Sequence, residues 1–82
     1  MTAPAAGTAE AFIAAVKGRH PGVRYFVRYF AWAHLPDHLM PISMACGLLA
    51  LEMIGSLPDG PELTTGLRKL LEAKDCFVRA AV

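Results

Sequence analysis

Apolar residues recur at intervals of three and four along much of this chain, the spacing that places them on one face of an α-helix. The spacing is clearest near the C-terminus, at Leu63, Leu67, Leu70, Leu71, Phe77, Val78 and Ala81. Pro61 suits the first position of such a helix, and Glu62 complements the positive end of its dipole. The pattern therefore predicts a helix over residues 61–80.

The preceding segment, residues 38–56, predicts a second helix that is apolar on almost every side. We expect Asp37 to cap it, and Pro41 falls in its first turn, where a missing amide costs little. The sequence LPDGP over residues 57–61 is a dense turn signal. Because a turn of about five residues joins two helices of about 20 residues, they must run antiparallel as an α-hairpin.

The apolar stretch over residues 39–57 approaches the roughly 20 residues that a membrane-spanning helix needs. Pro41 and Glu52 interrupt it, and a carboxylate at mid-membrane costs roughly 3 kcal/mol. We therefore interpret this segment as a helix buried in the core of an oligomer. Glu52 could act as an acid in such apolar surroundings, but a carboxylate there more often pairs with a cation, and the hairpin would bring Arg68 or Lys69 near it.

Before the hairpin, residues 1–7 consist mostly of Ala, Pro, Gly and Thr, a composition typical of a flexible tail. Thr8 then suits the N-cap of a short helix, and the apolar residues after it form one stripe. Gly18 and the sequence His20-Pro21-Gly22 are expected to end this helix.

The sequence VRYF then occurs twice in succession, over residues 23–30. A repeat of four residues is close to the helical period, so a helix would stack Arg24 on Arg28. It would stack Tyr25 on Tyr29 in the same way. These β-branched and aromatic residues also suit an extended strand, and of the two we favour the helix.

Together these elements predict an all-α fold with three parts. They are a flexible tail over residues 1–7, a helical segment rich in aromatic and basic residues over 8–34, and an antiparallel helical hairpin over 35–82. The chain has 82 residues, of which 55% are apolar and 18% are charged. A domain of this size buries only about 60% of the surface of its unfolded chain, so it cannot hide all of this apolar area alone. We therefore expect a homo-oligomer.

The net charge of +1 is unevenly divided along the chain. Four cations against Glu10 give residues 1–30 a charge of +3, and four cations against six acids give residues 31–82 a charge of −2. Neither a strongly basic arm nor an acidic tail is present. Two cysteines are too few for the disulfide framework of a small secreted domain, and the N-terminal residues lack the pattern of a signal peptide. We expect a cytoplasmic protein with reduced cysteines.

No arrangement in the sequence predicts catalysis or metal binding. His34 and His38 lie four residues apart, but Pro36 breaks the helix that would bring them together. The sequence places no base within reach of Cys76, and it contains no glycine-rich phosphate loop. We therefore expect no enzyme, no metal site and no cofactor.

Rings and cations gather at two places in the chain. The first cluster contains Arg24, Tyr25, Arg28, Tyr29 and Trp32, and the second contains Arg68, Lys69, Lys74 and Arg79. Flat rings beside guanidinium groups suit a ligand with bases to stack and phosphates to pair. Aromatic stripes more often pack in a core, with the arginines on a solvated face. Both interpretations stay open on the residues alone.

The motifs before, within and after the hairpin follow one another in the order of a known family of small domains. The order runs from Trp32-Ala-His-Leu35 through a polar turn, a long helix and a short loop to a last helix that carries Leu70–Ala80. This order resembles the small α-hairpin domain of phage anti-defence sponge proteins over residues 29–81. The resemblance implies homo-oligomers of helical hairpins in the host-cell cytoplasm. Such oligomers sequester cyclic oligonucleotide or cyclic ADP-ribose-type messengers of bacterial immunity (CBASS and Thoeris) without cleaving them.

Carried over by position, the resemblance implies that Trp32 is the ring that stacks on a base. It implies that Arg79 is the cation near the end of the last helix. Related domains often carry a basic residue early in the long helix, where this chain has the uncharged residues 42–47. Either the missing charge comes from elsewhere, such as Arg28 or Lys74, or the pocket is lost or altered. The predicted ligand-binding residues are Trp32, Arg79, Arg28, Tyr29 and Lys74.

The predicted function is a non-catalytic sponge that holds a cyclic di- or trinucleotide, or a cyclic ADP-ribose-type ligand, in pockets between protomers. Nanomolar affinity corresponds to about −12 kcal/mol. A stacked base contributes roughly 1–3 kcal/mol and a charge-assisted hydrogen bond roughly 1.5–3 kcal/mol, so one hairpin cannot supply enough groups. The alternative is a small helical oligomerisation or interaction protein with no small-molecule ligand. Weak nucleic-acid binding through residues 17–28 ranks third, and we expect neither a membrane nor a nucleic-acid polymer as partner.

Overall fold

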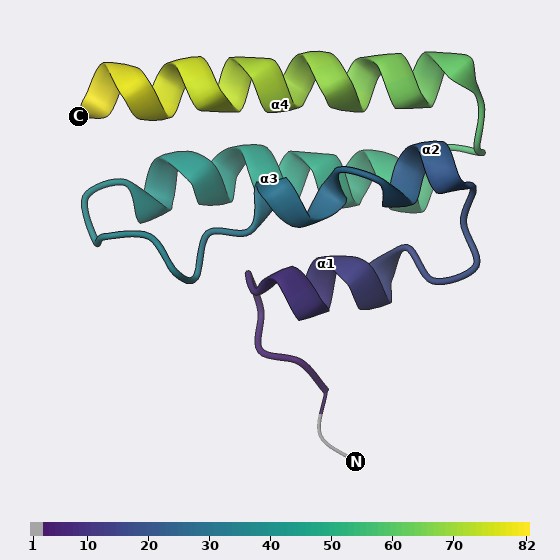
Figure 1. The fold of residues 1–82 in the computed structure, drawn as a ribbon, viewed down its shortest axis with the longest axis horizontal. Coiled ribbons are helices and arrows are strands. Elements are labelled where there is room, and N and C mark those ends of the chain that lie inside the picture. The colour runs from purple at the N-terminus through teal and green to yellow at the C-terminus, as the bar shows by residue number, and fades with distance from the viewer. Residues whose placement is uncertain (1–2) are drawn as a thin grey trace.

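The chain folds into helices joined by short connections, and no strand occurs in residues 3–82, the part that this computed structural model describes. The elements are α1 (Ala9–Ala15), α2 (Pro21–Arg24), the 3-10 helix η1 (Val27–Phe30), α3 (Met40–Ser56) and α4 (Pro61–Ala81) (Figure 1). The prediction of an all-α fold is confirmed.

The two long helices, α3 and α4, form the hairpin. They pack side by side and run antiparallel, as the short turn between them requires (Figure 1). α4 spans Pro61–Ala81, close to the predicted 61–80, with Pro61 in its first turn. Its residues Leu63 and Leu67 are buried in the core.

α3 begins at Met40, two residues later than the sequence predicts. Asp37 does not cap it, so that prediction is wrong: the N-cap residue is Leu39, and no side chain caps the helix. The reason is a turn that precedes the helix. In it the amides of Leu39 and Met40 both donate to the carbonyl oxygen of Pro36 at 3.0 Å. Asp37 lies inside this turn, away from the first helical residue.

α1 begins where the sequence predicts, because Oγ1 of Thr8 accepts a hydrogen bond from the amide of Ala11 at 3.2 Å. The residue before the cap, Gly7, is buried and belongs to the fold. Its carbonyl oxygen accepts hydrogen bonds from the amides of Trp32 and Ala33 at 2.9 and 3.1 Å. The structure thus anchors the end of the predicted tail, whose first two residues lie outside the described part of the chain.

The VRYF repeat is helical, but it does not form the continuous helix that we expected. α2 ends at Arg24, and η1 forms over the second copy of the repeat. The backbone leaves the helical region at Phe26, whose φ and ψ are −121° and 7°. Each copy still buries its Val and its Phe and exposes its Arg and its Tyr. The segment therefore presents two Arg–Tyr pairs to solvent.

The core lies where the N-terminal helices meet the hairpin. The ring centroid of Phe12 lies 6.3 Å from that of Phe30 and 5.7 Å from that of Trp32, which it meets edge to face. The hairpin contributes Ala50, Ile54, Leu63 and Leu67 to the same cluster. Burying one large apolar side chain contributes roughly 1.5–3 kcal/mol. The N-terminal segment and the hairpin therefore stabilise each other as one unit.

Arg19 joins the connection before α2 to the connection between α3 and α4. Its Nε donates to Oδ1 of Asp59 at 2.7 Å. Its Nη1 and Nη2 donate to the carbonyl oxygens of Ile54 and Leu57 at 2.6 and 2.8 Å. Because the last carbonyl groups of a helix have no partner within it, Arg19 caps the C-terminal end of α3.

Asp59 receives a second hydrogen bond in this arrangement, from the amide of His20 at 2.9 Å. The bond from the His20 amide, followed by the bond from the Arg19 side chain, lowers the pKa of the Asp59 carboxyl below its ordinary value of 3.8. The carboxylate form of Asp59 therefore holds the two connections together.

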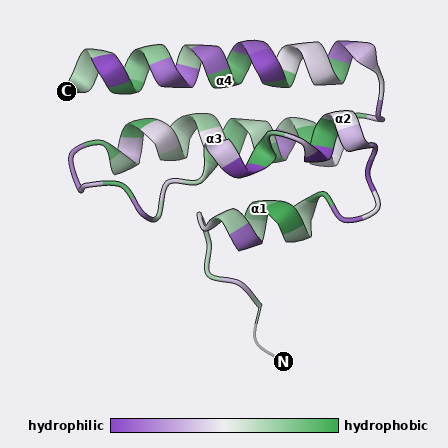
Figure 2. Cartoon of the chain, viewed as in Figure 1, coloured by the Kyte–Doolittle hydropathy of each residue, from purple (hydrophilic) through white to green (hydrophobic). Residues whose placement is uncertain are grey.

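α3 carries few hydrophilic residues along its length (Figure 2). Met44, Leu48 and Leu49 are 37%, 50% and 44% exposed there. Glu52 is exposed and makes no ion pair with the described residues, so the expected pairing with Arg68 or Lys69 is wrong. Along residues 3–82, no helix combines the length and the hydropathy that crossing a membrane requires. In a single chain, α3 is thus covered on one side only.

Candidate functional site

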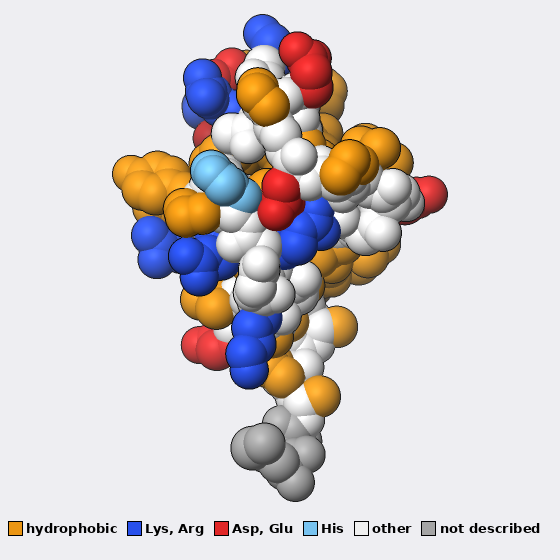
Figure 3. All heavy atoms as spheres, turned by 90° about the vertical axis from the view of Figure 1, so that its right-hand side faces the viewer, with side chains coloured by type: hydrophobic (Ala, Val, Ile, Leu, Met, Phe, Trp, Pro, Cys, Tyr) orange, Lys and Arg blue, Asp and Glu red, His pale blue; other side chains and the backbone are white. Residues whose placement is uncertain are grey.

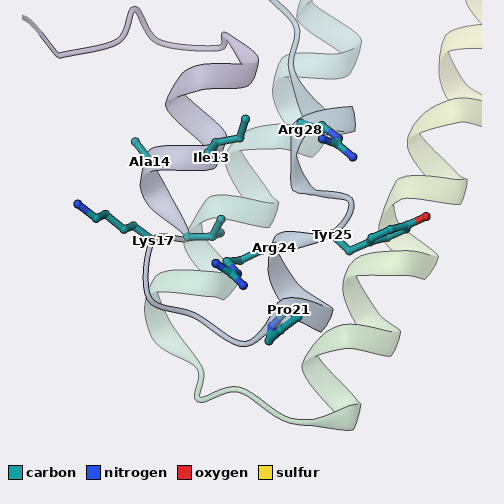
Figure 4. A pocket seen from close by; sticks show the side chains of 8 residues that line it. Ile13, Ala14, Lys17, Pro21, Arg24, Tyr25 and Arg28 are labelled. Atoms are coloured by element: carbon teal, nitrogen blue, oxygen red, sulfur yellow. The ribbon is translucent and has the colours of Figure 1, made fainter.

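A hollow between α1 and α2 opens on the surface and has a volume of about 520 Å³. Its lining residues are Ile13, Ala14, Val16, Lys17, Pro21, Arg24, Tyr25 and Arg28 (Figure 4). Three of these residues are cations and none is acidic. We call this hollow the cationic cavity.

Three different elements position the three cations. Lys17 follows α1, Arg24 ends α2, and Arg28 lies in η1. None of them forms a salt bridge with a residue of the described range. The guanidinium of Arg24 lies between α1 and α2, and the side chains of Lys17 and Arg28 extend outward on opposite sides of the hollow (Figure 4). This spread suits a ligand that carries more than one negative charge.

A second hollow, of about 540 Å³, lies between the α2–η1 segment and α4. Its lining residues are Gly22, Tyr25, Phe26, Tyr29, Thr64, Arg68, Leu71 and Glu72. We call it the aromatic cavity because three of these residues carry rings. Tyr25 also lines the cationic cavity, and its side chain extends from α2 toward α4 (Figure 4). One tyrosine therefore separates a charged hollow from a mostly apolar one.

Two of the predicted ligand residues, Arg28 and Tyr29, lie at these cavities. Arg28 lines the cationic cavity and Tyr29 lines the aromatic cavity. The guanidinium carbon of Arg28 lies 5.4 Å from the centre of the Tyr29 ring, within the range of a cation–π interaction. Tyr29 is 54% exposed and Tyr25 is 72% exposed, so both rings are accessible to a ligand.

Trp32 lies in the core instead, and only 7% of it is exposed. A Cβ atom on Gly7 would lie 2.4 Å from its indole ring, and one on Gly47 would lie 2.7 Å from it. Phe12 packs against the same ring. The stacking role that the resemblance implies for Trp32 is not available in this arrangement, because neighbouring residues of the same chain already cover the ring.

The other two predicted residues lie elsewhere on α4. Lys74 pairs with Asp75 at 2.8 Å, and only 13% of its side chain is exposed. Arg79 lies in the last turn, where its Nη2 is 3.4 Å from Sγ of Cys76. Neither residue lines the cationic or the aromatic cavity. Within one chain, the structure thus brings together only Arg28 and Tyr29 of the five.

The two cysteines have different surroundings. Cys46 is buried in α3, and burial raises the pKa of its thiol, while the positive charge of Lys74 lowers it to a lesser extent. Cys76 is exposed on α4. In residues 3–82, no cluster of three or more His, Cys, Asp or Glu side chains is placed to hold a metal ion.

Comparisons with family models, curated proteins and solved structures give no match for this chain. The chemistry of the two cavities and the sequence resemblance are therefore the grounds for a function.

The structure adds residues that the sequence did not place at the site. Thr64, Arg68 and Glu72 reach the aromatic cavity from α4, about 40 residues after the repeat. No local spacing could indicate this, because it depends on how α2 packs against α4. Lys17 belonged to the basic stretch of residues 17–28, but only the turn after α1 brings it beside Arg24.

Figure 3 views the molecule from the end that holds the α3–α4 turn. Hydrophobic side chains cover much of the right in this view, and Lys and Arg side chains lie mostly at the centre and on the left, among hydrophobic and acidic ones (Figure 3).

Proposed function

We propose that this protein is a non-catalytic sponge that binds cyclic nucleotide messengers, of the cyclic oligonucleotide or cyclic ADP-ribose type, as a homo-oligomer. The observation that carries the proposal is the cationic cavity. Lys17, Arg24 and Arg28 line this hollow together with the exposed Tyr25, and its lining contains no acidic residue.

The chemistry of the cavity matches a phosphodiester ligand. A phosphodiester keeps its negative charge across the physiological pH range, and Arg binds phosphate oxygens through two parallel hydrogen bonds. Tyr25 and Tyr29 offer faces on which bases can stack. In this proposal these two rings, rather than Trp32, perform the stacking.

In this proposal the cavity binds the ligand and does not cleave it. Cations and a phenol hold and neutralise a phosphodiester, whereas hydrolysis needs a general base that activates a water molecule. No carboxylate or imidazole is among the residues that line the cationic cavity.

The energetics favour a site that two copies share. Two or three charge-assisted hydrogen bonds at roughly 1.5–3 kcal/mol each, with one or two stacked bases at roughly 1–3 kcal/mol each, must exceed an association cost of several kcal/mol. An open cavity that surrounds the ligand on one side leaves little above that cost. The exposed apolar side of α3 gives copies a surface on which to associate, and the exposed Arg79 of a second copy can then add to the site.

The test is isothermal titration calorimetry with cyclic di- and trinucleotides and cyclic ADP-ribose isomers. Arg24→Ala and Arg28→Ala should each weaken binding by about 1.5–3 kcal/mol, roughly 10- to 100-fold. Lys69→Ala is the matched control, because Lys69 is exposed and lines neither cavity. Absence of heat from every compound in the panel would remove the proposal.

A second candidate is a helical interaction protein without a ligand, and the exposed Met44, Leu48 and Leu49 of α3 favour it. It predicts a stable assembly that is indifferent to Arg28→Ala. The third possibility is weak nucleic-acid binding through residues 17–28. Calorimetry with duplex DNA at several salt concentrations tests it, because an affinity that depends on phosphate contacts falls steeply as the salt concentration rises.

A further inference from the structure

The aromatic cavity carries polar groups that the proposed function does not yet use. On one side are the rings of Tyr25, Phe26 and Tyr29, and on the other side is α4 with Thr64, Arg68 and Glu72. The three α4 residues are four apart, so they lie in one row along the same face of the helix. The cavity thus combines flat faces with a polar edge.

Arg68 and Glu72 are free to bind a ligand. Both side chains are exposed, and neither forms a salt bridge with the residues that the structure describes, although their spacing would permit a bond between them. They lie four residues apart on one face of α4, about 6 Å along the axis. A donor and an acceptor side by side at one wall of the cavity can meet the acceptors and the donors of one purine.

We propose that the aromatic cavity is a base subsite that selects guanine, with Glu72 as the residue that determines the specificity. The inference rests on the proposed function, because it names the base of a nucleotide whose phosphate binds in the cationic cavity. Tyr25 borders both cavities, so a base and its own phosphate can occupy the two hollows on either side of this ring.

The selectivity follows from the hydrogen-bonding pattern of the bases. A carboxylate only accepts hydrogen bonds, and guanine offers it two parallel donors, at N1 and at the 2-amino group. Arg68 can donate to the guanine O6 and N7 acceptors. Adenine places an acceptor at N1, so its lone pair would face the Glu72 carboxylate without a proton between them. Glu72 therefore attracts guanine and repels adenine.

The experiment compares cyclic di-GMP with cyclic di-AMP, which carry the same two phosphates, by calorimetry on the full chain. We expect the wild-type protein to bind cyclic di-GMP at least tenfold more tightly. In Glu72→Gln the ratio should fall to within about threefold, because an amide offers one donor and one acceptor and can meet either base. Glu62→Gln, on the same helix but away from this cavity, should keep the wild-type ratio.

Two further measurements separate the base from the phosphate. Arg24→Ala should weaken both ligands equally and leave their ratio unchanged, because Arg24 lines only the cationic cavity of the two. Cyclic di-IMP, which lacks the 2-amino group, should bind the wild-type protein at least fivefold more weakly than cyclic di-GMP. This measurement needs no variant and so remains valid if Glu72→Gln fails to fold.

The outcomes distinguish the two proposals. Equal affinity of the wild-type protein for the guanine and adenine ligands, or an unchanged ratio in Glu72→Gln, would overturn the guanine subsite and leave the sponge proposal intact. No binding of any cyclic nucleotide would overturn both.

Discussion

Two glycines determine where the single tryptophan of the chain lies. Gly7 has a φ of +80°, which side chains other than glycine rarely adopt, and Gly47 lies within α3. Both approach the indole ring of Trp32 more closely than a Cβ atom would allow. The missing side chains create the space for the ring, so the position of Trp32 depends on residues 25 and 15 places away in the sequence.

We predict that Gly47→Ala destabilises the protein by about 1–3 kcal/mol, because its methyl group would overpack the core at 2.7 Å from Trp32. Gly66→Ala is the control: it lies within α4, and a Cβ atom there meets nothing within 4 Å. That variant should gain up to about 1 kcal/mol, since Ala favours the helix over Gly. Urea unfolding followed by the fluorescence of Trp32 measures both. Equal stability of the two variants would mean that the indole ring is not packed as described.

At the scale of elements, the fold depends on how its short connections are fastened. Arg19 bonds to two carbonyl oxygens at the end of α3 and to Asp59, and the amide of His20 bonds to the same carboxylate. The planar guanidinium can serve all three acceptors at once, which a lysine ammonium on a flexible stem cannot do in the same geometry. This contact fixes the start of α2, and with it the position of Arg24 at the cationic cavity.

This fastening predicts a dependence of stability on pH. The pKa of Asp59 is lower in the folded chain than its ordinary value of 3.8, so the folded state binds the proton less readily than the unfolded state. The stabilisation is fully present above pH 3.8 and is lost as the pH falls through the lower folded value. Asp59→Asn should be less stable than the wild-type protein at pH 7, and the difference should shrink below pH 3.8. Chemical denaturation at pH 7 and pH 3 measures this. Asp37→Asn serves as the control, and a difference that stays constant with pH would contradict the assignment.

The sequence predicts those features of the elements that neighbouring residues determine, and it misses those that depend on contacts between distant segments. The Thr8 cap, the start of α4 at Pro61 and the antiparallel hairpin are consequences of neighbouring residues, and all three are present. The break at Phe26 and the burial of Trp32 result from packing between distant segments, which no local spacing records. The candidate site divides in the same way. The repeat indicates the exposed Arg–Tyr pairs, but the partners from α4 require the tertiary fold.

At the scale of the whole molecule, the cationic cavity and the exposed apolar residues of α3 belong to different elements. The cationic cavity is built by α1, α2 and η1, whereas the exposed apolar residues Met44, Leu48 and Leu49 belong to α3. A change on α3 can therefore disturb association between copies without removing a cation from the cavity. This separation makes it possible to ask whether binding requires the assembly.

If copies associate through the exposed side of α3, Met44→Lys should give a monomer of 8.8 kDa, because no acidic residue lies one turn away on the helix and a charge there cannot be buried against a second copy without a partner. Ser56→Lys places the same charge at an exposed position at the end of α3 and should leave the assembly unchanged. Sedimentation equilibrium gives the mass, and calorimetry on the same samples gives the affinity for the cyclic nucleotide. If two copies share the site, the monomeric variant should bind at least tenfold more weakly, although Lys17, Arg24 and Arg28 are intact. Full affinity in the monomer would place the entire site within one chain, and a wild-type mass of 8.8 kDa at every concentration would exclude a shared site.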